Sequence, residues 1–258
     1  MSGGAPLLSV RDLTLRFGGV TALDDVSFDV EEGELFSVIG PNGAGKTSIF
    51  NCLNGVYRPE RGSITLDGHE LVGERPVTTA KLGLARTFQN LGLFVGLTVV
   101  DNLMLGRHHL MRTGFVSGAL WFGRARREEI EHRRRVEEVM DLLELQTYRN
   151  RPVGLLPYGI QKRIELGRAL AMDPKLLLLD EPVAGMNVEE TEDMARYILE
   201  IGAALDLAII LVEHDMHVVM DIADRVLALD FGVVLATGTP AEVQSDPAVI
   251  EAYLGQAS

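Results

Sequence analysis

The stretch GPNGAGKT, Gly40 to Thr47, constrains the fold of this 258-residue chain more than any other feature. It matches the pattern G-x-x-x-x-G-K-[ST], between a short apolar strand signal, LFSVIG, and an apolar-periodic helix signal, KTSIFNCLNG. Glycines let successive backbone N–H groups surround phosphate oxygens without Cβ clashes, and the helix N-terminus adds partial positive charge. A plain Gly-rich turn is the alternative, but the flanking strand and helix favour a phosphate-binding loop.

The pattern predicts specific roles for the side chains of Lys46 and Thr47. Lys46 is expected to reach the β- and γ-phosphates of a nucleotide such as ATP, and the Thr47 hydroxyl to ligate Mg²⁺. The residues predicted to contact the nucleotide here are Gly40, Pro41, Asn42, Gly43, Ala44, Gly45, Lys46, Thr47 and Ser48.

A second motif, LLLLDEP, supplies carboxylates. Four leucines predict a fully buried strand that delivers Asp180 at its carboxyl end, where open α/β sheets bind ligands. Asp180 would hold Mg²⁺ directly or through water, and Glu181 would polarise an attacking water molecule. An ordinary strand followed by an acidic turn is the alternative, and the nearby phosphate loop argues against it.

The order of secondary-structure signals indicates the fold class. Leu8–Phe17 and Leu23–Val30 alternate as half-buried strands do, whereas residues from about Leu97 to Ala171 lack strand signals and suggest helices. Strand signals return at KLLLLD, LAIILV, RVLALD and GVVLAT. The sequence therefore predicts an α/β protein with a parallel nucleotide-binding core and a helical insert.

Composition excludes some classes of function. The formal net charge of -13 and the pI near 4.9 disfavour nucleic-acid binding, because such a chain repels a phosphate backbone. The single cysteine, Cys52, permits no internal disulfide and is expected to be a small buried hydrophobe. The N-terminus lacks a signal-peptide pattern, and no apolar run approaches the roughly 18 residues that span a bilayer. We expect a soluble, cytoplasmic protein whose membrane role comes through a partner.

One segment departs from the acidic average. Arg107 to Arg135 contains eight arginines and three glutamates, a formal charge of +5. Such a cluster can face anionic lipid or an acidic partner, but a solvated helix face is the favoured interpretation. We interpret Arg126–Leu145 likewise as a charged helix with an apolar seam.

The phosphate loop, the helical insert, LPYGIQ, LLLLDEP and LVEHD follow one another in an order that resembles the ATP-binding subunit of an ABC transporter. The resemblance covers nearly the whole length. It is closest to the ATPase subunits of branched-chain (hydrophobic) amino acid importers, through RTFQNLGLF, NCLNG, TGFVSGALWF, LVEHDM and IEAYLG. It implies one ABC ATPase domain over 1–258: a P-loop NTPase core with an antiparallel β subdomain at 1–95 and 172–258, and an all-helical insert at 96–171.

In this family a Leu-Ser-Gly-Gly-Gln signature caps a helix and points its amides at the γ-phosphate held by a second ATPase subunit. The matching positions here are Leu156, Pro157, Tyr158, Gly159 and Ile160. The Ser hydroxyl is missing, Tyr replaces a glycine and Ile replaces Gln, while the helix dipole and the amides around Gly159 survive. Losing one hydroxyl donor costs a few kcal/mol in barrier, which argues against fast hydrolysis at the composite site. A plain helix cap is the alternative.

The resemblance implies further roles one residue at a time. Phe17 matches the aromatic that stacks on adenine, although alone it would suggest strand core. Gln89 matches the glutamine that senses Mg²⁺ and water and touches the transmembrane subunits, and His214 matches the switch histidine at the γ-phosphate. Asn187 ends the dimer-interface loop VAGMN where many relatives have Asp, so communication between the two sites is expected to differ.

These features together favour an ATP-hydrolysing subunit that drives import of a small solute, with branched-chain or other hydrophobic amino acids preferred. Two ATP molecules would clamp two ATPase subunits, and permease helices would fit a groove near Gln89, on the inner face of the cell membrane. The altered signature favours a heterodimer whose partner supplies an intact one. The alternatives are the ATPase of a lipid or lipopolysaccharide exporter, an ABC ATPase acting on nucleic acid or ribosomes, and a regulatory module that binds ATP without turnover. The sequence does not name the solute.

Overall fold

A six-stranded sheet forms the centre of the molecule in a computed structural model that describes residues 5–87, 92–110 and 124–254. Its order is β10-β9-β3-β8-β7-β6, parallel except for β10, which runs antiparallel to β9. The strands are β3 (Leu35–Ile39), β6 (Leu84–Arg86), β7 (Leu176–Asp180), β8 (Ala208–Val212), β9 (Arg225–Asp230) and β10 (Val233–Gly238). Every residue of β3, β7 and β8 is buried, as expected of parallel strands covered on both faces.

A smaller antiparallel sheet has the order β2-β1-β4-β5. Its strands are β1 (Leu8–Phe17), β2 (Val20–Val30), β4 (Arg61–Leu66) and β5 (His69–Glu70). Leu8 and Val10 point into the same hydrophobic cluster as Phe36, Val38 and Leu178 of the central sheet. The two sheets thus share one core, and the predicted antiparallel β subdomain is confirmed.

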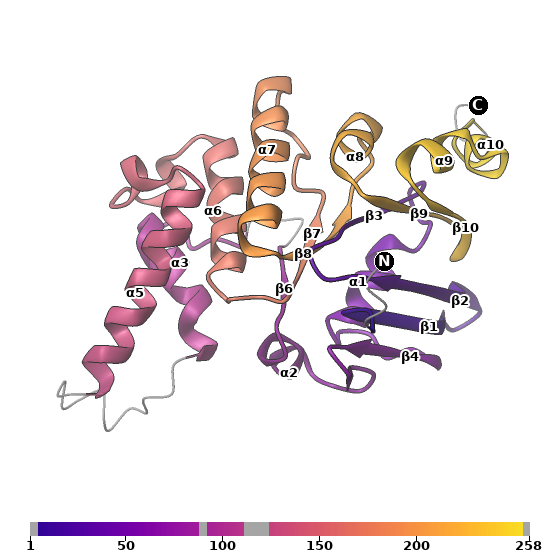
Figure 1. The fold of residues 1–258 in the computed structure, drawn as a ribbon, viewed down its shortest axis with the longest axis horizontal. Coiled ribbons are helices and arrows are strands. Elements are labelled where there is room, and N and C mark those ends of the chain that lie inside the picture. Colours follow the sequence, from indigo (N-terminus) through magenta and orange to yellow (C-terminus); the bar gives the residue numbers. More distant parts are fainter. Residues whose placement is uncertain (1–4, 88–91, 111–123, 255–258) are drawn as a thin grey trace.

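Helices cover the central sheet and form one end of the molecule. They are α1 (Lys46–Leu53), α2 (Pro76–Lys81), α3 (Val99–Gly106), α5 (Arg124–Leu142), α6 (Tyr158–Leu170), α7 (Val188–Leu205), α8 (Met216–Ile222), α9 (Pro240–Ser245) and α10 (Pro247–Leu254). Short 3-10 turns occur at η1 (Arg107–Leu110), η2 (Gln146–Tyr148) and η3 (Val153–Leu155). Figure 1 shows α3, α5 and α6 grouped at one end of the long axis, with β1, β2 and β4 toward the other.

The helical end is joined to the central sheet by apolar contact. Leu103 of α3, Val139 of α5, Ile164 of α6 and Ile198 of α7 belong to the same buried cluster as Leu177 of β7. The parts of 97–171 that the structure describes contain no named strand. We keep the division into a core of 1–95 plus 172–258 and a helical insert of 96–171 as a proposal.

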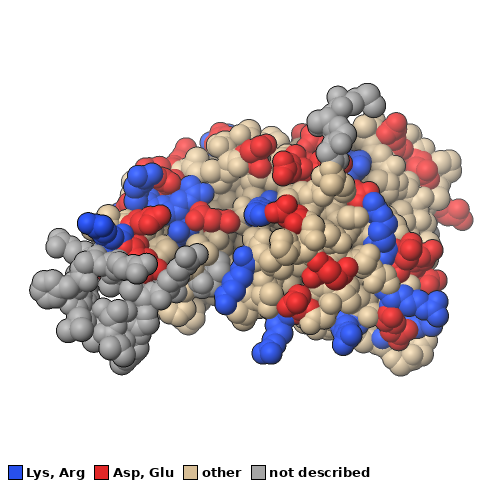
Figure 2. Space-filling model, turned by 60° about the horizontal axis from the view of Figure 1, so that its bottom comes forward, with Lys and Arg blue, Asp and Glu red and all other residues tan. Residues whose placement is uncertain are grey.

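Two expectations drawn from composition can be compared with the structure. Cys52 is buried, and burial raises the pKa of its thiol to about 12, so it behaves as a small hydrophobe. No helix in the described part of the chain is long and apolar enough to cross a membrane. On the face drawn in Figure 2, Lys and Arg side chains lie among Asp and Glu side chains, and its described residues form no continuous basic surface.

Four of the eight arginines in the basic segment form ion pairs within the described part of the chain. Arg107 is buried and donates to the Ala171 carbonyl oxygen at 2.9 Å, and it also pairs with Asp173. Arg133 pairs with Glu129 at 2.9 Å, one helical turn away on α5. These pairings favour a structural, solvated helix face over a lipid- or acid-binding patch.

Candidate active site

The phosphate loop leaves the end of β3 and leads directly into α1. Gly40 has φ +152°, and a Cβ there would come within 2.1 Å of the Leu229 carbonyl oxygen. Gly45 caps α1 with φ +110°, where a Cβ would lie 2.8 Å from the Ala22 carbonyl oxygen. Backbone crowding therefore requires glycine at both ends of the loop, which keeps its amides unobstructed.

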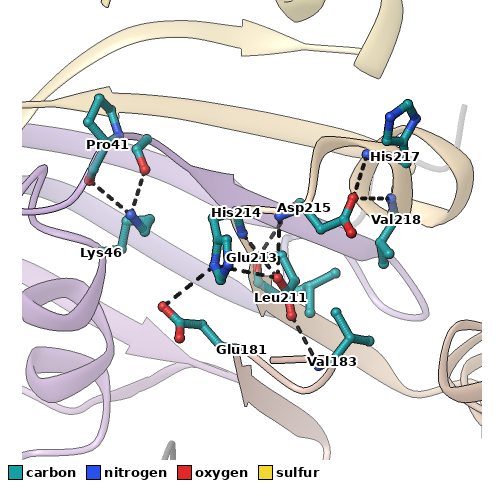
Figure 3. A network of polar contacts seen from close by, with 12 residues as sticks. Pro41, Lys46, Glu181, Val183, Leu211, Glu213, His214, Asp215, His217 and Val218 are labelled. Atoms are coloured by element: carbon teal, nitrogen blue, oxygen red, sulfur yellow. Dashed lines mark hydrogen bonds and ion pairs between the residues drawn. The ribbon is translucent and has the colours of Figure 1, made fainter. Parts of the chain in front are cut away.

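Lys46 begins α1 with its ammonium folded back into the loop. Its Nζ donates to the carbonyl oxygens of Gly40 at 2.5 Å and Pro41 at 2.9 Å, and the residue is buried (Figure 3). Burial lowers the pKa of Lys46, and the negative charges of Glu181 and Asp180 raise it in part. The ammonium thus lies within electrostatic reach of both predicted carboxylates.

Asp180 ends β7 and is fixed by a buried ion pair. Its Oδ2 accepts from Arg86 Nη2 at 2.8 Å, and Arg86 Nη1 donates to Asn51 Oδ1 at 2.6 Å. The Arg86 guanidinium also lies over the Phe50 ring, 5.4 Å from its centroid. Arg86 therefore orients the Asp180 carboxylate from β6 while α1 holds Arg86 in place.

Glu181 follows Asp180 in an unusual backbone conformation. Its φ is 48°, in the left-handed region that costs energy for a residue with a Cβ. Its N–H donates to the Val212 carbonyl oxygen at 2.9 Å, which anchors the turn to the end of β8. The side chain is 21% exposed, so the carboxylate can meet a water molecule.

His214 reaches the same place from the next strand. Its Nδ1 lies 3.9 Å from Glu181 Oε1 and 3.8 Å from Glu213 Oε2, and its side chain is 61% exposed (Figure 3). These distances exceed a hydrogen bond, so the ring is close to Glu181 without being fixed by it.

Glu213 is a buried carboxylate that the sequence analysis did not identify. It is fully buried and accepts the N–H groups of Val183 at 3.1 Å and His214 at 3.0 Å. Burial raises the pKa of Glu213, and these backbone donors lower it in part. Glu213 thus ties the end of β8 to the loop after β7 and holds His214 next to Glu181.

The signature residues lie at the start of α6, away from α1 along the long axis of the molecule (Figure 1). Pro157 is the N-cap of α6 and Tyr158 is its first helical residue. Leu156 and Gly159 are buried, and Ile160 packs against the helical core. A Cβ at Gly159 would lie 2.7 Å from the carboxylate of Glu190 on α7, so the helix approaches the start of α7 closely.

The remaining predicted residues have different outcomes. Phe17 ends β1 with 48% of its surface exposed and its ring 5.0 Å from that of Tyr57, so it is not strand core. Asn187 caps α7 by accepting the Glu190 N–H at 3.0 Å, which is a structural reason for Asn there. Gln89 lies outside the described residues.

The donor set fits magnesium-bound nucleotide. The loop offers backbone amides around Gly43, where a Cβ would meet no atom within 4 Å, and the exposed Thr47 lies at the start of α1. Hydroxyl and carboxylate oxygens of Thr47 and Asp180 are the hard donors that Mg²⁺ prefers. The described part of the chain contains no group of three or more His, Cys, Asp or Glu residues that could hold a metal ion.

Comparison with known proteins finds relatives along nearly the whole chain. The family described as ABC transporter matches residues 23–184, and one described as branched-chain amino acid ATP-binding cassette transporter matches residues 233–258. The high-affinity branched-chain amino acid transport ATP-binding protein BraF of Pseudomonas aeruginosa is 43% identical over 255 residues, covering 98% of this chain and 99% of the relative. LivG of Salmonella typhimurium, named for the same role, is 43% identical over 252 residues, with 98% and 99% covered.

Solved structures agree with this similarity. The ADP conformation of an ATP-binding cassette of an ABC transporter has a TM-score of 0.85 and 28% identity to this chain, covering 98% of this chain and 100% of that one. The first family match covers the phosphate loop, the signature positions and Glu181, whereas Phe17, Glu213 and His214 lie outside it.

Proposed function

Because the chain belongs to the ABC transporter family, we propose that it is the ATP-hydrolysing subunit of an importer for branched-chain or other hydrophobic amino acids. The observation that carries the proposal is the neighbourhood of β3, β8 and β7 in one parallel sheet. Their carboxyl ends deliver Lys46, His214 and Glu181 to the same edge, where open α/β sheets bind ligands. The full-length similarity to branched-chain amino acid transport ATP-binding proteins favours that solute class.

In the proposed reaction, the residues at the carboxyl ends of β3, β7 and β8 have separate roles. The amides of Gly43 to Thr47 and the Lys46 ammonium would bind the β- and γ-phosphates, in place of the Gly40 and Pro41 carbonyl contacts that Lys46 makes in this structure. Glu181 would accept a proton from the attacking water, and His214 would contact the γ-phosphate from β8. Phe17 would stack on the adenine.

Mg²⁺ belongs to this proposal as the ion that comes with the nucleotide. When bound, it neutralises negative charge on the β- and γ-phosphate oxygens. Thr47 and Asp180 would hold it, with Gln89 as a further ligand. Arg86 prevents the Asp180 carboxylate from rotating away, because one carboxylate oxygen is already paired with its guanidinium.

Dimerisation completes the proposed site. The phosphate loop and the signature lie apart in this chain, which supports a second ATPase subunit as the source of the signature that faces Lys46. The positions Leu156 to Ile160 lack the Ser hydroxyl, so a heterodimer with an intact partner signature is favoured. Permease subunits would contact the region near Gln89 at the inner face of the membrane.

A tagged chain carrying Glu181→Gln tests this proposal. Glutamine keeps the size of the side chain but removes the base, so Mg-ATP binding should persist while hydrolysis falls by about 10²- to 10⁴-fold. The stalled complex, purified from the native membrane with Mg-ATP, should contain a different ATPase subunit and two permease types, identified by mass spectrometry.

Three results would contradict parts of this proposal. An unmutated chain that hydrolyses ATP fully as a homodimer would remove the case for an obligate partner. Co-purified lipid-handling chains would support the exporter alternative instead. Unchanged phosphate release in the Glu181→Gln variant would contradict the role of Glu181 and favour a regulatory module.

A further inference from the structure

Tyr158, where the family signature has glycine, bridges two segments of the same chain. Its hydroxyl donates to the Ala184 carbonyl oxygen at 3.2 Å, joining the first residue of α6 to the loop after β7. The edge of its ring lies 3.5 Å from where a Cβ on Gly185 would sit, and Gly185 has φ +79°. Glycine at 158 could not make this hydrogen bond.

Lys162 follows one helical turn later and points to the same loop. It is only 4% exposed, and its Nζ lies 3.5 Å from the Glu181 carbonyl oxygen. The ammonium is also 5.9 Å from the centroid of the Tyr158 ring, within the range of a cation–π contact. Burying an ammonium is costly unless polar groups receive it, so the Glu181 carbonyl is a specific partner.

The contacts of Tyr158 and Lys162 are linked to each other by a hydrogen bond within the loop backbone. The Ala184 N–H donates to the same Glu181 carbonyl oxygen at 3.2 Å, while the Ala184 carbonyl receives Tyr158. Glu181 itself has φ 48°, a conformation that needs support from its surroundings. The first turn of α6 therefore supports the backbone of the residue proposed as the base.

We propose that Tyr158 and Lys162 are positioning residues that connect the signature helix to Glu181 of the same chain. This rests on the proposed function, in which the N-terminus of α6 faces nucleotide held by the partner subunit. A phosphate drawn to that N-terminus changes the position of the first turn of α6, and both contacts pass that change to Glu181. Nucleotide bound between the two subunits at one site thereby affects the position of the Glu181 carboxylate at the other site.

Two substitutions test the connection in the complete transporter complex. Tyr158→Phe removes one hydroxyl and keeps the ring, and Lys162→Met removes the ammonium and keeps the length of the side chain. We expect kcat for ATP to fall about 2- to 10-fold in each, the effect of one lost hydrogen bond, while KM and the equilibrium Kd for ATP stay within about twofold. Lys162→Arg should restore kcat, because it returns a cation at the same place.

The control is Tyr148→Phe, which removes a hydroxyl from η2 in the same helical region and should leave kcat unchanged. Unchanged kcat in both test variants would overturn the inference. So would a fall in kcat that only follows a matching loss of ATP affinity or of unfolding free energy, since that indicates packing alone. A wild-type complex without ATP turnover would instead contradict the proposed function, before any variant is compared.

Discussion

Phe17 is the residue whose role can be tested with the least disturbance to the rest of the protein. Its ring is half exposed and contacts Tyr57 edge to face at an interplanar angle of 74°. Phe17→Ala should leave the fold intact but remove a stacking surface for adenine, raising the Kd for ATP about 3- to 10-fold. Titration with a fluorescent ATP analogue measures this. The exposed Phe94 provides a control, and an equal loss in Phe94→Ala would contradict the assignment.

Single residues were predictable where a motif fixes their neighbours in sequence. Lys46, Asp180 and Glu181 come from contiguous patterns that follow apolar strands, and the structure places their charges close together. Arg86 and Glu213 were not predicted, because their partners are distant in the chain: Arg86 and Asp180 are 94 residues apart. The quoted RTFQ and LVEHD stretches contained both residues, but only folding shows what they contact.

At the scale of elements, His132 joins α5 to the start of η1. Its Nδ1 accepts from Arg107 Nε at 3.1 Å, which requires a neutral ring, and the facing carboxylates are those of Glu128, Glu131 and Asp173. Burial, and then Arg107, lower the pKa of His132 below its ordinary 6.5. The unfolded chain therefore binds this proton at higher pH than the folded chain, and acidification below 6.5 destabilises the fold.

His132→Gln should reduce that pH dependence. Urea unfolding at about pH 7.5 and about pH 5.5 measures the loss of stability on acidification, which we expect to be smaller in the variant than in the wild type. His69→Gln, at an exposed position, should leave the loss unchanged. An equal loss in wild type and His132→Gln would show that other groups cause the acid sensitivity.

Elements with strong patterns were predicted well, and short elements were not. The apolar runs of β7 and β8 are unambiguous, because burial on both faces dictates them. The alternation of β1 breaks at Arg11 and Asp12, where the pairing register with β2 shifts. β6 has only three residues, and the alternation of β4 spans only Ser63 to Leu66 after Gly62, so both signals are too short to stand out in the sequence. The antiparallel pairing of β10 also depends on contact with β9 rather than on local sequence.

At the scale of the whole molecule, nucleotide binding should be visible as stability. A ligand that binds only the folded state adds RT ln(1 + [L]/Kd), about 2.7 kcal/mol at 100 times Kd. The Glu181→Gln chain, which should not consume ATP, should show this gain in chemical denaturation with Mg-ATP. Lys46→Ala should show little gain, since it lacks the ammonium in the phosphate loop. Equal gains in both would place the nucleotide elsewhere.

The apolar cluster shared by α3, α5, α6 and β7 limits how the helical end of the molecule can move. A wide hinge opening would bring hydrocarbon such as Leu103 and Leu177 into water, at about 25 cal/mol for each Å² uncovered. Sliding along the interface keeps these side chains covered and costs far less. We therefore expect the helical end to transmit motion to a neighbouring permease by short shear displacements, in which α3, α5 and α6 slide while the apolar cluster stays buried.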